Sequence, residues 1–366
     1  MLMSFSLSAL EILVGILLLF GGGELFVAGS VALSLLLGIP QIVIGLTVVS
    51  MGTSAPELFV SLLSTLQGGT AGDAIAVSNV VGSNIFNVLV VLGASALVMP
   101  LRVKSRLVKR DVPLLLGVSM ATWGMASGGR LTWVAGLALI TGTVINLIWE
   151  VRSAKEEPAE AADDLDTEGA AAPPVAAAKL AAGLGLLVLG SQLLVKGATA
   201  AAQGLGVSET VIGLTIVAAG TSMPELVTSL VAAYRGKADL AIGNVVGSNL
   251  LNQLVILGLC GLVSGGRGLG VDPVMISRDF PIMVATTLAC LPIFWSGGVI
   301  TRLEGGILVG LYGLYLVEQI LTNSVPAAAD EFRLVVLVAV LPLLLVFLAW
   351  GSLRWRQLRR EARAQS

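Results

Sequence analysis

The chain contains the same two-part motif twice. The segment GLTVVSMGTSAPE at Gly45–Glu57 returns as GLTIVAAGTSMPE at Gly213–Glu225. Each copy is followed by a second block, NVVGSNIFN at Asn79–Asn87 and NVVGSNLLN at Asn244–Asn252. Both copies place a glutamate within an apolar run, where a charge is costly and needs a reason. An internal repeat in a hydrophobic chain is typical of transporters that are built from two halves.

The composition supports a membrane protein. The chain is 56% hydrophobic and 12% charged, whereas an average soluble protein is roughly 25% charged. Apolar runs that could cross about 30 Å of hydrocarbon recur along almost its whole length. We therefore predict an all-α polytopic membrane protein. Eleven spans are expected near residues 7–30, 40–66, 73–99, 112–127, 131–150, 178–202, 208–234, 239–264, 279–297, 303–322 and 333–352.

One polar linker divides these spans into five, five and one. Arg152–Pro174 is acidic and then rich in Ala and Pro, and we predict it to be disordered. With an odd number of helices per half, the second copy enters the membrane from the opposite side, so the repeats are expected to be inverted. The predicted units are a first five-helix repeat (1–150), the acidic cytoplasmic linker (151–177), a second inverted five-helix repeat (178–322), and an extra helix with a basic tail (323–366).

The distribution of Lys and Arg predicts the orientation. If the N-terminus lies outside, the basic cluster Arg102–Arg110, the linker and the tail arginines from Arg354 to Arg363 all lie inside. That arrangement satisfies the positive-inside rule, and the opposite one violates it. We therefore expect a cytoplasmic linker and a cytoplasmic C-terminal tail.

Several function classes are disfavoured. The chain has no histidine, which excludes His-based catalysis and imidazole metal sites. No nucleophile–base pair or metal motif appears in the loops, so we expect a transporter without a cofactor and not an enzyme. The basic residues lack interleaved aromatic residues, which argues against nucleic-acid binding. No feature of the sequence indicates a protein partner.

Each repeated glutamate directly follows a proline. Pro56 precedes Glu57 and Pro224 precedes Glu225. A proline inside a helix removes a backbone hydrogen bond and disturbs the turn before it, so carbonyl oxygens near the GTS triplets should lack their usual partners. Irregular backbone at membrane depth needs a polar partner, and a cation is one. Carboxylate, carbonyl and hydroxyl oxygens are the hard ligands that Ca²⁺ prefers, and Na⁺ is expected to use them similarly.

The second block supplies further oxygens. Ser83 and Asn87 are four residues apart on one helical face, as are Ser248 and Asn252. Their side chains can complete a cage around an ion, although interhelical hydrogen bonding by Ser and Asn is an open alternative. The glycine before each serine is expected to allow close helix packing.

Other charges in the spans are interpreted as structural. Glu11, Glu150 and Glu318 lie near span ends, where we expect them to face lipid headgroups. Glu24 and Lys196 are not duplicated in the repeat, and we expect snorkelling or a structural contact from them.

The paired GTSxPE and GSN blocks resemble the two α-repeats of the calcium/cation antiporter superfamily, the sodium/calcium exchangers and their bacterial relatives. The resemblance covers roughly residues 7–322, leaves out the eleventh helix, and looks closest to the bacterial calcium/sodium antiporter branch. It implies that spans two, three, seven and eight form the ion site, while spans one and six slide across this core. It assigns roles to the following residues: Glu57 and Glu225 as Ca²⁺ ligands, Thr53 and Thr221 through backbone oxygens, and Ser54, Ser83, Ser222 and Ser248 at sodium sites.

Two positions depart from the family pattern. Ser78 stands where the family usually has glycine. Asn252 stands where several relatives, including potassium-dependent exchangers, carry aspartate, so the site lacks a third carboxylate and matches Asn87 of the first copy. We accordingly expect Ca²⁺/Na⁺ exchange independent of potassium in the bacterial inner membrane. Ca²⁺/H⁺ exchange is the alternative, because a glutamate at low dielectric can hold a proton; a cation channel is a further one.

Overall fold

The fold is almost entirely helical. The computed structural model describes residues 2–104, 106–156, 172–205, 218–295 and 298–340, with the single positions 212, 216, 342 and 346. Its α-helices are α1 (Leu2–Leu37), α2 (Gln41–Ile44), α3 (Ser50–Thr53), α4 (Ala55–Gln67), α5 (Gly69–Phe86), α6 (Gly93–Val98), α7 (Val112–Ala126), α8 (Trp133–Glu156), α9 (Pro173–Gly204), α11 (Ala218–Gly220), α12 (Met223–Tyr234), α13 (Ala238–Leu251), α14 (Gly258–Val263), α15 (Phe280–Trp295), α16 (Arg302–Ser324) and α17 (Pro326–Val335). Between them lie the π-helical segments η1 (Gly45–Val49), η2 (Asn87–Leu92), η3 (Leu107–Asp111), η7 (Asn252–Leu257), η9 (Met275–Asp279) and η10 (Val336–Val340), and the 3₁₀ turn η8 (Gly265–Arg267).

The membrane character of the fold is confirmed. Among the described residues, 7 helices are long and apolar enough to cross a bilayer. An eighth candidate is the pair Gln41–Thr53 and Ala55–Gln67, which is bent by 48°. The first and sixth predicted spans extend beyond their expected ends, since they form α1 and α9. The predicted spans at 208–234 and 333–352 fall partly outside the described residues, as does most of the linker, and the tail arginines lie entirely outside them.

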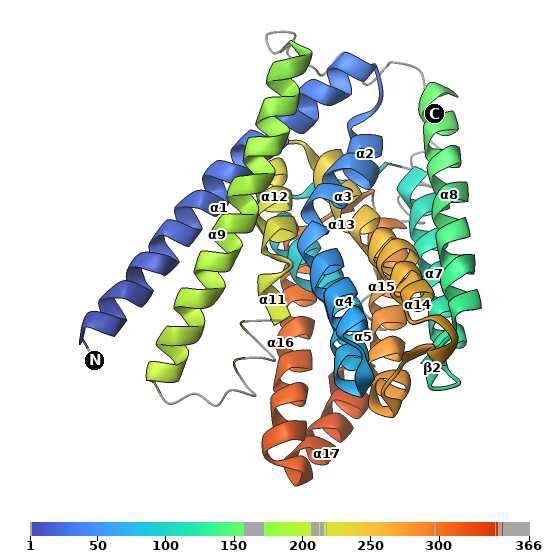
Figure 1. Cartoon of the computed structure of the whole chain (residues 1–366). Helices are drawn as coiled ribbons and strands as arrows, with labels where there is room; N and C mark the ends of the chain where they lie inside the picture. The colour runs from blue at the N-terminus through green and yellow to red at the C-terminus, as the bar shows by residue number, and fades with distance from the viewer. Residues whose placement is uncertain are drawn as a thin grey trace.

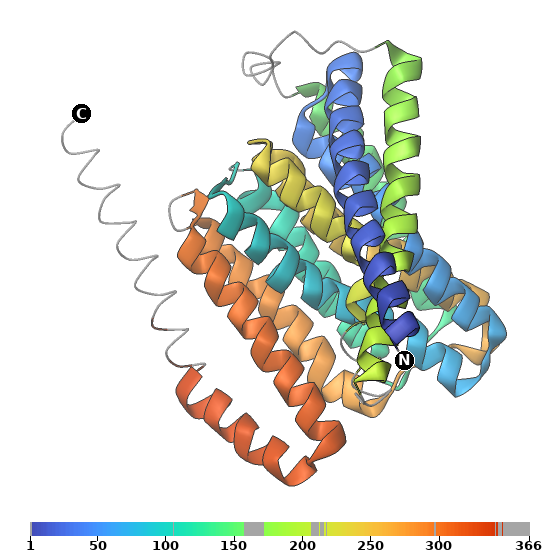
Figure 2. The ribbon, with the colours of Figure 1, turned by 90° about the vertical axis from the view of Figure 1, so that its left-hand side faces the viewer.

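Helices α1 and α9 form a close antiparallel pair. They cross at the edge of the bundle, and the second view shows them side by side along their length (Figures 1 and 2). Glycines at seven-residue intervals line the seam: Gly15, Gly22 and Gly29 on α1, and Gly183, Gly190 and Gly197 on α9. A Cβ added at Gly22 would lie 2.8 Å from the backbone nitrogen of Leu187. Small residues let helix backbones approach closely, and this close approach holds helices together where lipid provides no hydrophobic drive.

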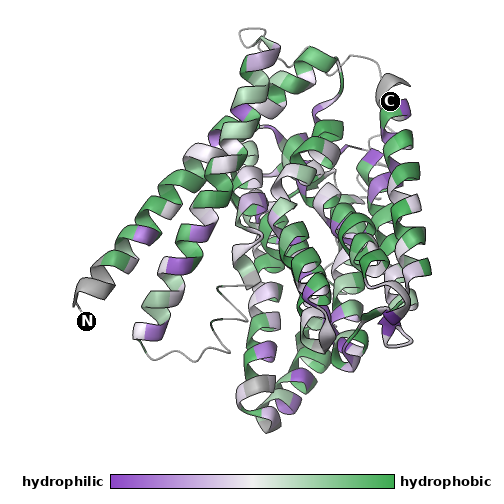
Figure 3. Cartoon of the chain, viewed as in Figure 1, coloured by the Kyte–Doolittle hydropathy of each residue, from purple (hydrophilic) through white to green (hydrophobic). Residues whose placement is uncertain are grey.

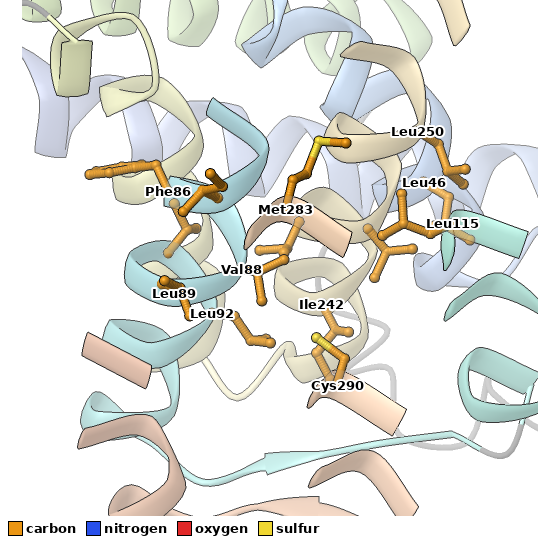
Figure 4. Close-up of a cluster of buried hydrophobic side chains, with 14 of the residues drawn as sticks. Leu46, Phe86, Val88, Leu89, Leu92, Leu115, Ile242, Leu250, Met283 and Cys290 are labelled. Atoms are coloured by element: carbon orange, nitrogen blue, oxygen red, sulfur yellow. The ribbon is translucent and has the colours of Figure 1, made fainter. Parts of the chain in front are cut away.

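The centre of the bundle consists of α5 with η2 and α13 with η7. Their apolar windows are 72% and 83% buried inside the protein, whereas those of α8, α9 and α16 are only 17–22% buried. Figure 4 shows buried side chains of both central helices, among them Phe86, Val88 and Leu89 of the first and Ile242 and Leu250 of the second, as parts of one hydrophobic core. Hydrophobic residues also run along the outer helices (Figure 3). The outer helices therefore meet lipid, while the two central helices are enclosed by protein.

Two short antiparallel ribbons join loops from the two halves of the chain. Strand β1 (Leu101–Arg102) pairs with β4 (Val299–Ile300), and β2 (Arg130–Leu131) pairs with β3 (Leu269–Gly270). The second ribbon also holds the start of α5, because Asp73 accepts a hydrogen bond from the Gly270 nitrogen at 2.9 Å. Each ribbon contains one strand from each half, so neither half completes a ribbon alone.

The close packing of α1 against α9 can be tested with a matched pair of glycine variants. Gly22→Ala adds a methyl group that must push α1 and α9 apart, and we expect it to lower the free energy of unfolding in detergent by about 1–3 kcal/mol. Gly21→Ala is the control, because no atom lies within 4 Å of its added Cβ. Thermal unfolding of both purified variants is the measurement. Equal stability of the two variants would contradict the close seam.

Candidate cation-binding site

Both GTSxPE motifs break their helices at the serine. Helix α3 ends at Thr53, and Ser54 leaves helical geometry with φ −80° and ψ 8°. Ser222 does the same with φ −89° and ψ 10° before α12 begins. Each proline occupies the first turn of the helix that follows, where its missing N–H breaks no helical hydrogen bond. The glutamates also fall in that first turn, near the positive end of the helix dipole.

The two breaks face each other and exchange hydrogen bonds. The hydroxyl of Ser54 donates to Glu225 Oε1 at 2.8 Å, and the hydroxyl of Ser222 donates to Glu57 Oε1 at 2.9 Å. Ser222 Oγ also lies 3.0 Å from Ser83 Oγ. Both glutamates are fully buried. Two buried carboxylates from distant parts of the sequence are thus each bound to the helix break of the other half.

Two asparagines hold the broken backbone in place. Asn79 Nδ2 donates to the carbonyl oxygen of Glu57 at 3.2 Å, and its Oδ1 accepts from Thr221 at 3.3 Å. Asn244 repeats the arrangement, since its Nδ2 donates to the carbonyl oxygen of Glu225 at 3.3 Å and its Oδ1 accepts from Thr53 at 3.1 Å. Each asparagine therefore connects the break of its own half to the GTS threonine of the other half.

A second set of amides joins the two central helices. Asn84 Nδ2 and Asn249 Nδ2 each donate to the other's carbonyl oxygen, at 3.3 and 3.1 Å. Asn87 Nδ2 donates to Asn249 Oδ1 at 3.1 Å, and Asn252 Nδ2 donates to Asn84 Oδ1 at 3.0 Å. Because the amide nitrogens are engaged in this network, the oxygens of Asn87 and Asn252 remain available to another partner.

Several buried oxygens of these residues accept no hydrogen bond. They are Oε2 of Glu57 and of Glu225, Oδ1 of Asn87 and of Asn252, and Oγ of Ser248. A buried polar atom without a partner costs about 1–3 kcal/mol, so these oxygens favour the binding of a cation. No group of three or more His, Cys, Asp or Glu occurs among the described residues. The site thus offers two carboxylates and neutral oxygens, a donor set suited to Ca²⁺ or Na⁺.

All ten residues predicted as ligands are described, and nine of them are buried. Thr221 is half-buried, and the role of the whole set in ion binding stays a prediction. The expected close packing is found at Gly247, where an added Cβ would lie 2.6 Å from the carbonyl oxygen of Leu46. It is wrong at Gly82, where no atom of another residue lies within 4 Å of an added Cβ. The repeated blocks contained Asn79, Asn244, Asn84 and Asn249, and their duplication was the signal that could have identified their roles.

The expectation that Glu150 and Glu318 face headgroups is wrong. Glu150 is 1% exposed and lies 2.9 Å from the guanidinium of Arg110, which stacks on the ring of Trp149. Glu318 is 9% exposed and pairs with Arg278 and Arg333. A carboxylate that is withdrawn from water requires such partners. Glu24 and Lys196 do make structural contacts, with Arg235 and Glu11 respectively.

This chain is similar to known proteins over most of its length. Residues 7–149 and 175–321 match the family model described as "Sodium/calcium exchanger protein". The chain is 40% identical over 307 residues to the putative antiporter CaxA of Alkalimonas amylolytica (81% of this chain, 94% of the relative). It is 31% identical over 347 residues to the sodium/calcium exchanger MaX1 of Methanosarcina acetivorans (84% and 97%).

Two further similarities extend over most of the chain. The inner membrane protein YrbG of Escherichia coli is 34% identical over 324 residues, which are 85% of this chain and 98% of YrbG. A solved structure of the sodium-calcium exchanger NCX_Mj superposes with a TM-score of 0.72 at 30% identity, covering 88% of this chain and 99% of that one.

The asparagine contacts lead to a test of the site's architecture. Asn79→Ala removes the donor that holds the Glu57 carbonyl, and we expect the dissociation constant for Ca²⁺ to rise about tenfold, as loss of a roughly 1.4 kcal/mol interaction implies. Asn244→Ala should behave alike, because it loses the matching contact. Ser78→Ala, an exposed neighbour on α5, is the control. Titration calorimetry on purified protein measures the constant, and a normal value in both asparagine variants would refute the assigned role.

Proposed function

The chain belongs to the sodium/calcium exchanger protein family, and on that premise we propose that it expels Ca²⁺ from the cell in exchange for entering Na⁺. It is a membrane-embedded cation antiporter and not an enzyme, and the ions are its transported substrates. The observation that carries the proposal is the buried pair of glutamates, each of which accepts a hydrogen bond from the serine of the opposite motif.

The charge of this site explains why cations would be exchanged. Two ionised glutamates carry two negative charges, which one Ca²⁺ or two Na⁺ would neutralise. An empty, doubly charged site at low dielectric is unfavourable, so the loaded states are the ones able to cross between the two sides. Asn252 adds an oxygen but no charge, which favours a cycle that does not require potassium.

We infer an inverted-repeat mechanism from the packing of α1 against α9. Gly15 meets Gly190 and Gly22 meets Gly183, so these two helices run antiparallel. They are the first helices of the two halves of the sequence. Their opposite directions support two repeats that are related by a two-fold axis in the membrane plane. Alternating access would follow if the pair slides over the fixed central helices. The repeats would span residues 1–150 and 178–322, with the linker 151–177 and residues 323–366 outside them.

The proposed location is the bacterial inner membrane, with the N-terminus outside. The described part of the basic cluster supports a cytoplasmic face near η3, because Lys104 and Arg106 precede that helix and Lys109 and Arg110 lie in its last turn. The linker and the tail would lie on the same face.

The coupling ion can be tested in inside-out vesicles loaded with Na⁺. We expect ⁴⁵Ca²⁺ uptake to follow an imposed Na⁺ gradient and to ignore an imposed pH gradient, because serine hydroxyls flank both glutamates. Uptake that responds to the pH gradient alone would point to Ca²⁺/H⁺ exchange and contradict the proposal. Ca²⁺ flux without any counter-ion would indicate a channel.

The glutamates provide the residue-level test. Glu57→Gln and Glu225→Gln should each reduce Ca²⁺ uptake to background while the protein still elutes as a folded species, since each removes half of the site's charge. Glu331→Gln, an exposed position on α17, is the matched control with normal uptake expected. Wild-type uptake in either site variant would show that the ion binds elsewhere.

Asn252→Asp probes ion selectivity. A third carboxylate lets the site hold one more positive charge, so we expect the number of cations exchanged for each Ca²⁺, or the dependence on K⁺, to change. The measurement is ⁴⁵Ca²⁺ uptake as a function of Na⁺, with and without K⁺. An unchanged ion profile would remove Asn252 from the set of selectivity-determining residues.

A further inference from the structure

Helix α1 covers one face of α12, and the matching face of α4 in the other half is uncovered. A Cβ added at Gly23 on α1 would lie 3.1 Å from Val227 Cγ1 and 3.3 Å from Val231 Cγ2 of α12. These valines are 5% and 4% exposed. The residues that match them in the repeat are Phe59 and Leu63 on α4, and they are 66% and 54% exposed. The halves are therefore alike in sequence but packed differently at this contact.

An ion pair joins the two helices at the end of this contact. Glu24 directly follows Gly23 on α1, and Arg235 follows the last residue of α12. The guanidinium of Arg235 donates to both carboxylate oxygens of Glu24, with Nε 3.3 Å from Oε1. The side chains are 57% and 42% exposed. An exposed ion pair typically shifts an equilibrium by up to about fivefold, which is enough to change which of two similar states is more populated.

The repeat carries no charge at the two matching positions. When the GTSxPE motifs are aligned, Gln192 on α9 matches Glu24, and Gln67 at the end of α4 matches Arg235. Both glutamines are exposed. Two inverted repeats reach their second state by exchanging conformations, so α9 would then cover α4 and these glutamines would approach each other. One state thus contains an ion pair where the other contains two neutral amides, and the two states are unequal in energy.

We propose that Glu24 and Arg235 form an ionic latch that favours the state in which α1 covers α12. The latch rests on the alternating access proposed above, and it adds a preference for one of the two states. With the N-terminus outside, α12 ends at the cytoplasmic face, so the latched state is closed toward the cytoplasm. Cytoplasmic Ca²⁺ then reaches the glutamates only in the less populated state, and its apparent affinity is lowered by that fraction.

The populations can be measured from the distance between two spin labels in lipid nanodiscs by double electron–electron resonance. Suitable exposed positions are Leu17 on α1 and Val263 at the end of α14. The native thiols of Cys260 and Cys290 are buried, so the introduced cysteines are the ones that react. Glu24→Gln removes the charge and keeps the side-chain size. We expect it to lower the ratio of the wild-type distance to the second distance by about two- to fivefold.

Two double variants test whether the charges act as a pair. Glu24→Arg combined with Arg235→Glu reverses the pair and should restore the wild-type ratio. Gln192→Glu combined with Gln67→Arg places an ion pair in the other half, and it should lower the ratio further when added to Glu24→Gln. If the reversed pair fails to restore a ratio that Glu24→Gln has lowered, the two charges do not act together and the latch is wrong.

Glu11→Gln is the matched control. Glu11 pairs with Lys196 at 2.7 Å, and this pair joins α1 to α9, which move together in the proposed cycle. The control should therefore leave the ratio unchanged. An equal ratio in Glu11→Gln and Glu24→Gln would overturn the latch. A single distance in every variant, in both Na⁺ and Ca²⁺, would show that α1 does not move, and alternating access would fall with the latch.

A transport measurement separates the latch from the proposed function. In inside-out vesicles, Glu24→Gln should reach half-maximal ⁴⁵Ca²⁺ uptake at a Ca²⁺ concentration about two- to fivefold lower than the wild-type protein. An unchanged concentration would overturn the latch while leaving exchange intact. If the wild-type protein shows no Na⁺-driven uptake, the proposed function falls instead, because the spin-label distances are measured without transport.

Discussion

The burial of two carboxylates at membrane depth is the constraint on which the rest of this structure depends. Glu57 and Glu225 are fully buried, and each receives its serine hydrogen bond from the break of the opposite motif. Such a pair is tolerated only if backbone, hydroxyl and amide groups surround it in fixed positions. The broken helices, the asparagines that hold their carbonyl oxygens and the enclosed central helices all meet that requirement.

The arrangement separates a rigid centre from a simpler periphery. The central helices are joined by reciprocal asparagine contacts, and the side-chain oxygens of Asn87 and Asn252 in the same network accept no hydrogen bond. The peripheral pair α1 and α9 is held instead by glycine backbones in close approach. Directional hydrogen bonds fix geometry, whereas a smooth glycine seam binds two helices without tying them to one register on the core. This difference is what the proposed mechanism requires, in which the ion ligands stay fixed while α1 and α9 move.

The sequence predicted the fold class, which is confirmed, and a set of candidate ligands whose role stays a prediction, because both follow from local patterns. Local sequence is enough to recognise apolar runs of membrane length, prolines before glutamates, and Ser and Asn four residues apart. Contacts between distant segments could not be predicted in this way. The crossed pairing of each asparagine with the opposite threonine depends on how the halves meet. So do the burial of Glu150 beside Arg110 and the different surroundings of Gly82 and Gly247. Each reflects tertiary packing that no single helix encodes.

The crossed contacts also bear on how such a chain is made. During synthesis the first half reaches the membrane before the second exists, and at that stage Glu57 lacks Ser222 while Asn79 lacks Thr221. Strand β1 likewise has no pairing partner until β4, close to the end of the second half, has been synthesised. The first half must therefore persist in the bilayer as an incomplete intermediate until its complement is inserted. The covalent linkage of the halves then matters for assembly, since it supplies the partner at high local concentration in the same membrane.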